Sequence, residues 1–514
     1  MTHWTAGYVA DIDYTYGYYA ELNPLRVRLA FLNAGLVPPE IGHACELGFG
    51  QGLSANAHAA ASVVSWVGTD FNPSQAGFAQ ELSRISGSGA LLLDEAFDAF
   101  CHRTDLPDFD YIGLHGIWSW ISDENRDVIV DFIRRKLKVG GVLYVSYNTQ
   151  PGWAAMVPMR DLLTEHAEVW GADGAGISQR IDAALAFADQ LLATAPAFAK
   201  VNPQIADRIA KIKTQDRHYI AHEYFNRDWR PMGFAQMHRW LQSAKLSWAC
   251  SANYLEAIDS VNLTAEQQSL LHSIPDSTFR QSTRDFCVNQ QFRKDYWVKG
   301  PRTLSALERL EALYEVQVIL AKPRTEISLT INGSLGEAVL QADVYVPVLD
   351  LLAALKPMSL KEIQGGLERL NGISIPFGQV LEAVMVLSSN GTVMPVQPET
   401  TIQACRHQTA KLNTHLMNKA RGSNDLNYLA SPVTGGAITV TRFKQLFLLA
   451  RQEGQLQPQD WAKFAWNILA AQGQRLVKQG QALQSDHDNL AELTEQAIRF
   501  SDEQLPVLIA LQIA

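Results

Sequence analysis

The stretch Glu46-Leu47-Gly48-Phe49-Gly50-Gln51-Gly52 follows a short apolar segment that ends in Ala44 and Cys45. Glycines at alternate positions after a strand leave the main chain bare, so a ligand can lie almost against it before the next helix begins. A second apolar segment ends in Asp70, whose carboxylate can accept hydrogen bonds from a ribose. Together these features predict a nucleotide-like cofactor site on an α/β sheet.

The spacing of the glycines distinguishes between two kinds of cofactor. A dinucleotide-binding loop has its third glycine three residues after the second, whereas Gly48, Gly50 and Gly52 alternate here. Glu46 stands just before them and can attract the ammonium group of a methionine moiety. The pattern therefore favours S-adenosyl-L-methionine (SAM), with a tight β–α turn that holds no ligand as the alternative.

Strand-like and helical segments alternate from residue 43 to residue 147. We expect strands at 43–47, 65–70, 90–93, 109–114 and 142–147, with helices at 53–62, 73–85 and 124–136. Such alternation is typical of a parallel sheet with helices on both faces. Ligands of these sheets bind at the carboxyl ends of the strands, which is where the glycine loop, Asp70 and His115 fall.

The ends of the second and third expected strands complete the predicted cofactor site. Phe71 and Asn72 follow Asp70, and Asp94 can accept from an adenine amine while Phe97 packs on the ring. Alternatively, Asp94 only caps the next helix. The residues assigned to the cofactor are Tyr16, Tyr19, Glu46, Gly48, Phe49, Gly50, Gly52, Asp70, Phe71, Asn72, Asp94, Glu95, Ala96, Phe97, His115 and Gly116.

Three residues are candidates for catalysis: His115, Tyr147 and Tyr18. His115 ends the fourth strand, beside the place of a transferred methyl group, and can orient a substrate or take a proton; the alternative is a structural histidine. No Asp-Pro-Pro-Tyr or Asn-Pro-Pro-Tyr signature follows this strand. The aromatic run 14–19 attracts cations, unless it belongs to an N-terminal helix that simply packs on the domain.

The loops after the fourth and fifth strands and the segment 218–224 are candidates for substrate binding. His218 and His222 are one helical turn apart, a spacing that can bind zinc. The pattern is not His-Glu-x-x-His and no third ligand is near in the sequence, so we assign no metal; polar packing is the alternative. The residues assigned to the substrate are Trp118, Trp120, Asn148, Trp153, His222 and Glu223.

Composition limits the class of protein. The chain has 514 residues, 47% hydrophobic and 19% charged, which is typical of an ordered globular protein. Its formal net charge of −10 disfavours nucleic acid as a partner. The five cysteines are scattered, which indicates reduced thiols and a cytoplasmic location. No signal peptide and no apolar run near the ~20 residues of a membrane span is present.

The chain after residue 147 changes in character. Residues 156–245 read as helical, and two strand-like pieces at 247–251 and 291–298 are expected to return and complete the first sheet. Residues 344–397 have the order helix, helix, helix, strand, which suggests a winged-helix-like module. It carries few basic residues, so packing or interaction is a better interpretation than DNA binding.

These pieces together resemble a bacterial class I methyltransferase that carries a methyltransferase regulatory domain. The resemblance rests on Tyr16-Gly17-Tyr18-Tyr19-Ala20-Glu21-Leu22-Asn23-Pro24, on residues 46–52, 115–120 and 146–153, and on Ala221-His222-Glu223-Tyr224. It extends over most of the chain. Proteins with this layout include rickettsial protein-lysine methyltransferases that modify an outer-membrane protein.

The resemblance implies a Rossmann-like sheet of seven strands that binds SAM and releases S-adenosyl-L-homocysteine, a helical insertion and a mainly helical C-terminal part. It also implies a protein substrate methylated on lysine and a homodimer. Methylation of a small molecule or polysaccharide hydroxyl, and SAM binding without catalysis, are the alternatives. The expected parts are 1–155 (SAM binding), 156–245 (helical insertion, dimerisation), 246–335 (regulatory region), 336–400 (winged-helix-like) and 401–514 (helical).

Overall fold

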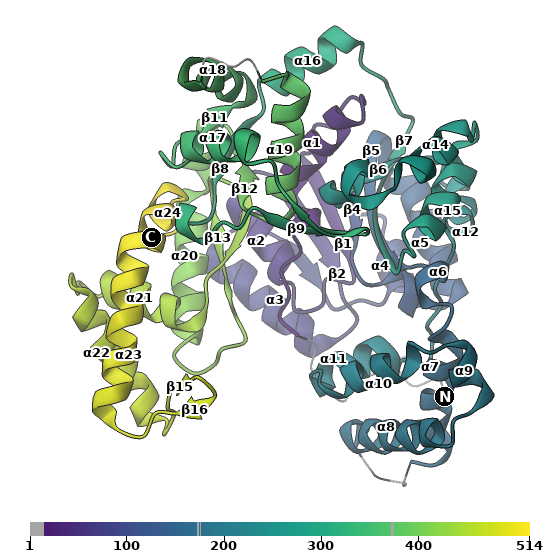
Figure 1. The fold of residues 1–514 in the computed structure, drawn as a ribbon, viewed down its shortest axis with the longest axis horizontal. Coiled ribbons are helices and arrows are strands. Elements are labelled where there is room, and N and C mark those ends of the chain that lie inside the picture. Colours follow the sequence, from purple (N-terminus) through teal and green to yellow (C-terminus); the bar gives the residue numbers. More distant parts are fainter. Residues whose placement is uncertain (1–14, 172–173, 175, 372–374) are drawn as a thin grey trace.

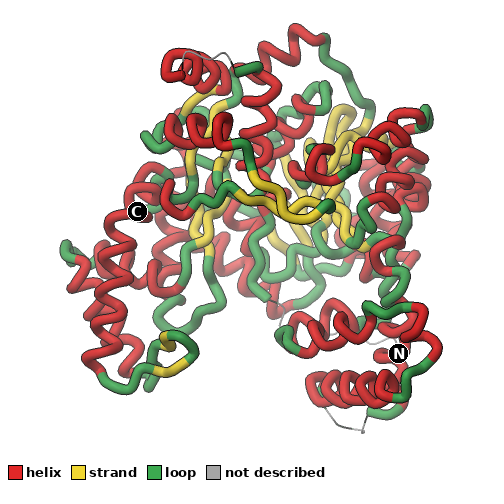
Figure 2. The backbone as a smooth tube through the Cα atoms, in the orientation of Figure 1, coloured by secondary structure: helices red, strands yellow, loops and turns green. Residues whose placement is uncertain are grey.

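The computed structural model describes residues 15–171, 174, 176–371 and 375–514 (Figure 1). Tyr14, the first residue of the aromatic run, lies outside them. Strands gather at the centre of the molecule and helices surround them (Figure 2). Within the described residues, no helix is both long and apolar enough to cross a bilayer.

The central sheet contains seven strands in the described part of the chain, in the order β3-β2-β1-β4-β5-β7-β6. The first five are parallel, and β7 is antiparallel to both β5 and β6. Their bounds are β1 (His43–Leu47), β2 (Ser65–Thr69), β3 (Leu91–Leu93), β4 (Phe109–Leu114), β5 (Leu137–Asn148), β6 (Leu246–Ser251) and β7 (Phe292–Lys299). The α/β class and the return of two later strands to the sheet are thus confirmed.

One boundary of the central sheet differs from expectation by more than one residue. Strand β5 begins at Leu137, five residues before the expected start at Val142. The register between β4 and β5 shifts between Phe109 and Tyr111, and Gly140 has a φ of 81°. Gly140 and Gly141, which suggest a turn in the sequence, therefore lie inside the strand, next to a β-bulge.

Successive residues of each strand point into two different cores, as the pleat requires. Ala44, Tyr111 and Tyr144 pack on one face with helix α1. Their neighbours Cys45 and Ile112 pack on the other face, with α4, α5 and α12. The helices around the sheet are η1 (Ala20–Leu22), α1 (Pro24–Asn33), α2 (Leu53–Ala61), α3 (Pro73–Ser86), α4 (Phe97–Cys101), η2 (Trp118–Trp120), α5 (Asp123–Lys136) and α12 (Phe234–Gln242).

The segment 150–224 is helical and has an apolar core of its own, away from the sheet at the lower right of Figure 1. Its helices are α6 (Gln150–Trp153), α7 (Val157–Val169), α8 (Ile177–Ala193), α9 (Ala197–Val201), α10 (Ile205–Lys213) and α11 (Arg217–Tyr224). Helix α12 ends the stretch expected to be an insertion, but Phe234, Met237 and Leu241 pack against the sheet.

A second group of short helices lies between β6 and β7. They are η3 (Tyr254–Ala257), α13 (Asp259–Asn262), α14 (Ala265–Ser273) and α15 (Ser277–Cys287). Their chain then enters β7, so that this region is tied into the sheet edge.

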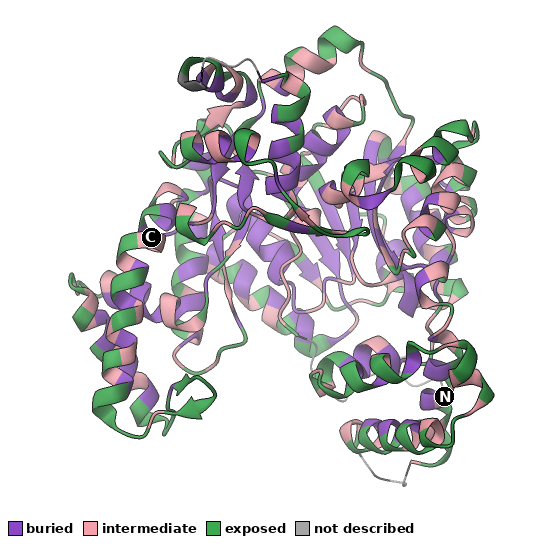
Figure 3. Ribbon diagram, in the orientation of Figure 1, coloured by how far each residue is buried: buried purple, intermediate pink, exposed green. Residues whose placement is uncertain are grey.

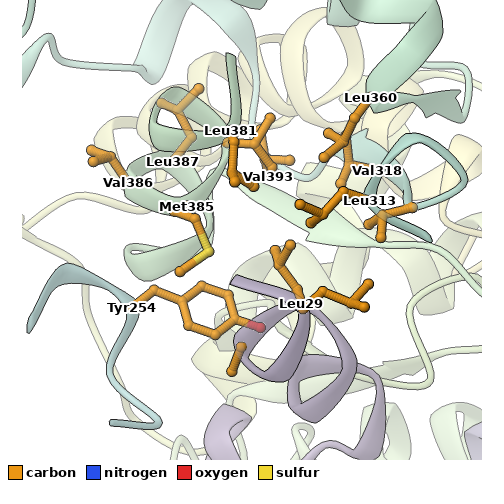
Figure 4. Packing of buried hydrophobic residues seen from close by; sticks show 14 of the residues in the cluster. Leu29, Tyr254, Leu313, Val318, Leu360, Leu381, Met385, Val386, Leu387 and Val393 are labelled. Atoms are coloured by element: carbon orange, nitrogen blue, oxygen red, sulfur yellow. The ribbon is translucent and has the colours of Figure 1, made fainter. Parts of the chain in front are cut away.

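The module after β7 has a small sheet of order β11-β8-β12 covered by three helices, in agreement with the expected winged-helix-like order. Figure 4 shows Leu29 of α1 and Tyr254 packed beside Met385 of α19, with Val318 and Val393 of the small sheet nearby. Its elements are α16 (Ala306–Tyr314), β8 (Gln317–Leu320), η4 (Arg324–Glu326), β9 (Thr330–Gly333), β10 (Gly336–Val339), α17 (Ala342–Leu352), β11 (Met358–Ser359), α18 (Leu360–Asn371), α19 (Phe377–Ser389) and β12 (Val393–Pro395). The module shares one core with helix α1.

The C-terminal part is mainly helical, as expected. Its elements are α20 (Glu399–Lys419), β13 (Tyr428–Ser431), β14 (Gly436–Thr439), α21 (Arg442–Gln452), α22 (Pro458–Ala471), β15 (Val477–Lys478), β16 (Gln481–Ala482), α23 (Asp486–Arg499), the π-helical turn η5 (Phe500–Gln504) and α24 (Leu505–Ala510). The part expected to be helical, 401–514, also contains two small hairpins, β13–β14 and β15–β16. Gly473 and Gly480 take φ values of 66° and 80° around a small hairpin.

Helix α2, which follows the glycine loop, is buried along its whole length of nine residues. It packs between the sheet and the C-terminal part, against α20 and the β13–β14 hairpin. The side chain of Gln397 donates to the main-chain oxygen of Ala61 at the end of α2, at 2.6 Å. Buried residues accordingly continue from the sheet into the C-terminal part (Figure 3).

Candidate functional site

The glycine loop turns sharply between β1 and α2. Gly48, Gly50 and Gly52 have φ values of 73°, 57° and 67°, a region that favours glycine. A Cβ on Gly48 would lie 2.3 Å from the side chain of Ile117, and one on Gly52 would lie 2.5 Å from Ala79. The bare main chain predicted from the sequence is thus required by both backbone conformation and packing.

A cavity of about 210 Å³ opens beside this loop. It lies at the carboxyl ends of the parallel strands, where the order of connections reverses between β1 and β4. Residues after β1, β2, β3 and β4 line it, and so do residues from the N-terminal segment and from α11. Six parts of the chain that are distant in sequence therefore meet at one cavity.

Two buried carboxyl groups lie at the base of the cavity. Asp70 accepts the amide of Gly50 at 2.8 Å on one oxygen and the amide of Asn72 at 3.0 Å on the other. Glu46 is 2% exposed, and its Oε2 has no hydrogen-bond partner among the described residues. Burial and, secondarily, the nearby Asp70 raise the pKa of Glu46 to about 8. Burial likewise raises the pKa of Asp70 to about 6, although the hydrogen bonds from the two amides lower it.

His115 is held in place from two sides. Its Nδ1 lies 2.7 Å from the hydroxyl oxygen of Tyr144, and the ring of Tyr19 stacks on it at a centroid distance of 3.6 Å. Burial lowers the pKa of His115 to about 3. The imidazole is therefore neutral at physiological pH, and it can orient a neighbour by hydrogen bonding without placing a positive charge in the cavity.

Most of the predicted cofactor residues meet at this cavity. Those that line it are Tyr19, Glu46, Gly48, Phe49, Gly50, Asp70, Phe71, Glu95, Ala96, Phe97, His115 and Gly116. Four others lie elsewhere. Tyr16 packs on Phe78, Gly52 begins α2, the side chain of Asn72 caps α3, and Asp94 is exposed and outside the lining.

Two of the three proposed catalytic residues do not reach the cavity. Tyr18 is packed against His58 and Tyr428, next to the β13–β14 hairpin. Tyr147 is fully buried on the other face of the sheet and donates to Asp295 at 3.0 Å. A pleated strand sends Tyr144 and Tyr147 to opposite faces, and Tyr144 is the one that contacts His115.

The predicted substrate residues divide in a similar way. Trp120, His222 and Glu223 line the cavity, and the indole of Trp120 donates to the main chain of Glu223 at 3.4 Å. The remaining three do not line it. Trp118 is buried, and its indole donates to the sulfur of Met232. The main-chain amide of Asn148 donates to the hydroxyl of Ser119, and the ring of Trp153 packs on that of Trp229.

Several lining residues were not predicted. They are Thr15, Gly17, Gln51, Gln75, Asp98, Ile117, Ile121, Ser122, Asn125 and Asp228. Ser122 and Asn125 begin the helix after β4, and Gln75 begins the helix after β2, so the rule that strand ends line the crevice would have found them. Asp228 had no comparable signal in the sequence.

Comparisons with known proteins agree with this architecture. Residues 216–299 match the family described as "Predicted methyltransferase regulatory domain". The Synechocystis protein described as "Uncharacterized protein sll1526" is 37% identical over 516 residues, which cover 99% of this chain and 100% of that protein. The chain therefore belongs to the same family as this Synechocystis protein, and it carries a segment that matches the predicted methyltransferase regulatory domain.

A solved structure has a similar fold over nearly the whole chain. The structure described as PKMT2 from Rickettsia typhi in complex with AdoHcy has a TM-score of 0.69 and 18% sequence identity, and it covers 95% of this chain and 98% of that one. The Rickettsia prowazekii protein RP789 is 26% identical over 290 residues, 55% of this chain and 51% of that protein. The residues that match the regulatory domain begin just before α11 and end with β7. This domain therefore supplies some of the residues that line the cavity, and it also supplies strands β6 and β7 of the central sheet.

Proposed function

We propose that this methyltransferase transfers a methyl group from SAM to a lysine side chain of a protein. The observation that carries the cofactor assignment is Glu46: a buried carboxyl group at the cavity, with one oxygen that has no hydrogen-bond partner among the described residues. A buried polar atom without a partner is costly, and the ammonium of the methionine moiety would satisfy it. The AdoHcy in the related PKMT2 structure supports the same cofactor.

The other cofactor contacts follow from the geometry. Asp70, on the second strand end, would accept from the ribose while it holds the Gly50 amide. Gly48 and Gly50 would present bare main chain to the sugar, and Phe97 lines the cavity where it can pack on the adenine. SAM, when bound, supplies an electrophilic methyl carbon.

The acceptor side of the cavity suits an amine. Trp120, His222, Glu223 and Asp228 line it, so an ammonium group is attracted by carboxylates and by the ring. A free lysine has a pKa of about 10.4, and its proton has to leave before nitrogen can attack. Desolvation beside Trp120 would lower that pKa, whereas the two carboxylates would raise it and could take the proton. Alignment of the acceptor would supply much of the acceleration.

The acceptor is tested with radiolabelled SAM and fractionated cells. We expect label in the protein fraction, recovered as methyllysine after acid hydrolysis. Label in the polysaccharide fraction would favour a hydroxyl acceptor; that reaction needs a general base, and His115 is a poor one because its pKa is lowered to about 3. SAM binding by calorimetry without label in either fraction would favour a binding protein.

A homodimer through 156–245 is part of the proposal and is measured by light scattering.

The affinity for SAM should rise with pH. Because the pKa of Glu46 is raised to about 8, this group is mostly protonated at pH 6 and ionises as the pH approaches 8. The ionised form attracts the ligand cation, whose ammonium group stays protonated below about pH 7.7. We expect calorimetry to show about a tenfold gain in affinity between pH 6 and pH 7.5.

The matched variant for this measurement is Glu46→Gln, which keeps the shape of the side chain and cannot ionise. Its affinity should be nearly constant over the same pH range. A wild-type profile that is flat, or one that Glu46→Gln leaves unchanged, would contradict the role given to Glu46.

A further inference from the structure

The N-terminal wall segment, residues 15–22, forms one side of the cavity. Thr15, Gly17 and Tyr19 line the cavity directly. The ring of Tyr19 lies on His115, and the amide of Tyr19 donates to Ser54 at 2.9 Å. This segment is irregular up to the short turn η1, so contacts with other elements have to hold it in place.

Strand β7 of the regulatory domain makes two of the contacts that hold this segment. Lys294 forms an ion pair of 2.6 Å with the carboxylate of Glu21, and the hydroxyl of Tyr296 donates to the main-chain oxygen of Glu21 at 2.7 Å. The side chains of Lys294 and Glu21 are only 28% and 17% exposed, so solvent screens this pair less than a surface pair.

The charge state of Glu21 agrees with this contact. Burial alone would raise the pKa of Glu21, but Lys294, Arg26 and His115 together lower it to about 2. Glu21 is therefore ionised at every physiological pH.

The same strand also supports His115, another lining residue, through β5. Tyr296 pairs with Tyr144, which contacts His115, and Lys294 pairs with Ser146, whose hydroxyl accepts the amide of Gly116. Strand β7 thus stands behind both His115 and the wall segment that covers it. A displacement of β7 would move two lining elements at once.

We infer that Lys294 is a positioning residue through which the regulatory domain holds the N-terminal wall segment over the cofactor cavity. This inference rests on the proposed function, because the position of the wall segment is measured through the affinity of the cavity for the proposed cofactor. When the wall segment is released, only the molecules that still have it in place bind the cofactor tightly. The apparent affinity is then the intrinsic affinity multiplied by the fraction of such molecules.

The test compares Lys294→Met with Lys299→Met. Lys299 lies on the same strand, and its ammonium donates to the main-chain oxygens of Arg134 and Leu137, away from the wall segment. Calorimetry with S-adenosyl-L-homocysteine should show about tenfold weaker binding for Lys294→Met and for Glu21→Gln, and wild-type binding for Lys299→Met. The double variant of Glu21 and Lys294 should bind no more weakly than either single one, and Lys294→Arg should restore affinity.

Hydrogen exchange without ligand supplies a second measurement. The amide of Tyr19 should exchange faster in Lys294→Met than in Lys299→Met, at equal global stability. Unchanged affinity and exchange in Lys294→Met, or fully additive effects of the two substitutions, would overturn the inference and leave the proposed function intact. A wild-type protein that fails to bind S-adenosyl-L-homocysteine would overturn the proposed function and this inference together.

Discussion

Asp70→Ala is expected to weaken SAM binding by about 100-fold or more, or about 2.7 kcal/mol. Hydrogen bonds to a charged group contribute about 1.5–3 kcal/mol each, and Asp70 would accept from the ribose. Its carboxylate also accepts the amides of Gly50 and Asn72, so its loss loosens the glycine loop as well. Isothermal calorimetry on the purified protein measures the change.

The control for this substitution is Asp94→Ala. Asp94 also follows a strand of the sheet, but it is exposed and lies outside the cavity lining, so its removal should leave the affinity within about twofold. If Asp70→Ala bound SAM within threefold of wild type, the proposed pocket would be wrong.

Arg293→Met is expected to destabilise the fold by about 3–5 kcal/mol, because removing one partner of a buried ion pair leaves uncompensated charge. The Arg293 guanidinium lies 2.5 Å from Asp285 and 2.8 Å from Asp295, and all three side chains are buried. Asp295 also accepts from Tyr147 and Trp248. This cluster joins β5, β6, β7 and α15, and urea denaturation measures its contribution.

Arg134→Met is the matched control. Arg134 also pairs with an aspartate, Asp131 at 2.5 Å, but its side chain is 52% exposed, and exposed pairs contribute only about 0–1 kcal/mol. Equal unfolding free energies for the two variants would show that the buried cluster contributes no more than a surface pair.

The positions of the strands could be predicted because the signal is local. Glycines, apolar segments and helical spacing recur in order from His43 to Val145, and a parallel sheet fixes which ends meet. The return of β6 and β7 was also predicted, from the two strand-like pieces at 247–251 and 291–298. The bulge at Gly140 was not, because a positive-φ glycine in a strand and one in a turn look alike in the sequence.

The direction in which each side chain projects was harder to predict than the position of its residue at a strand end. Tyr18 and Tyr19 are neighbours in one aromatic run, yet Tyr19 stacks on His115 while Tyr18 packs on His58. Tyr144 and Tyr147 differ in the same way across the sheet. Local pattern shows that a tyrosine lies near a strand end, but the packing of distant elements decides which one reaches the cavity. Asp228 joins the site by that packing alone.

The enclosure of α2 affects how deletions of this protein should be interpreted. Gln397 and Gly435, far along the chain, supply hydrogen-bonding partners to Ala61 and His58 of that helix. A chain cut after β7 would expose an alanine-rich flank of α2, directly behind the glycine loop. Loss of methyl transfer on such a deletion would therefore report a disturbed helix, and it would be no evidence that the deleted half touches the acceptor.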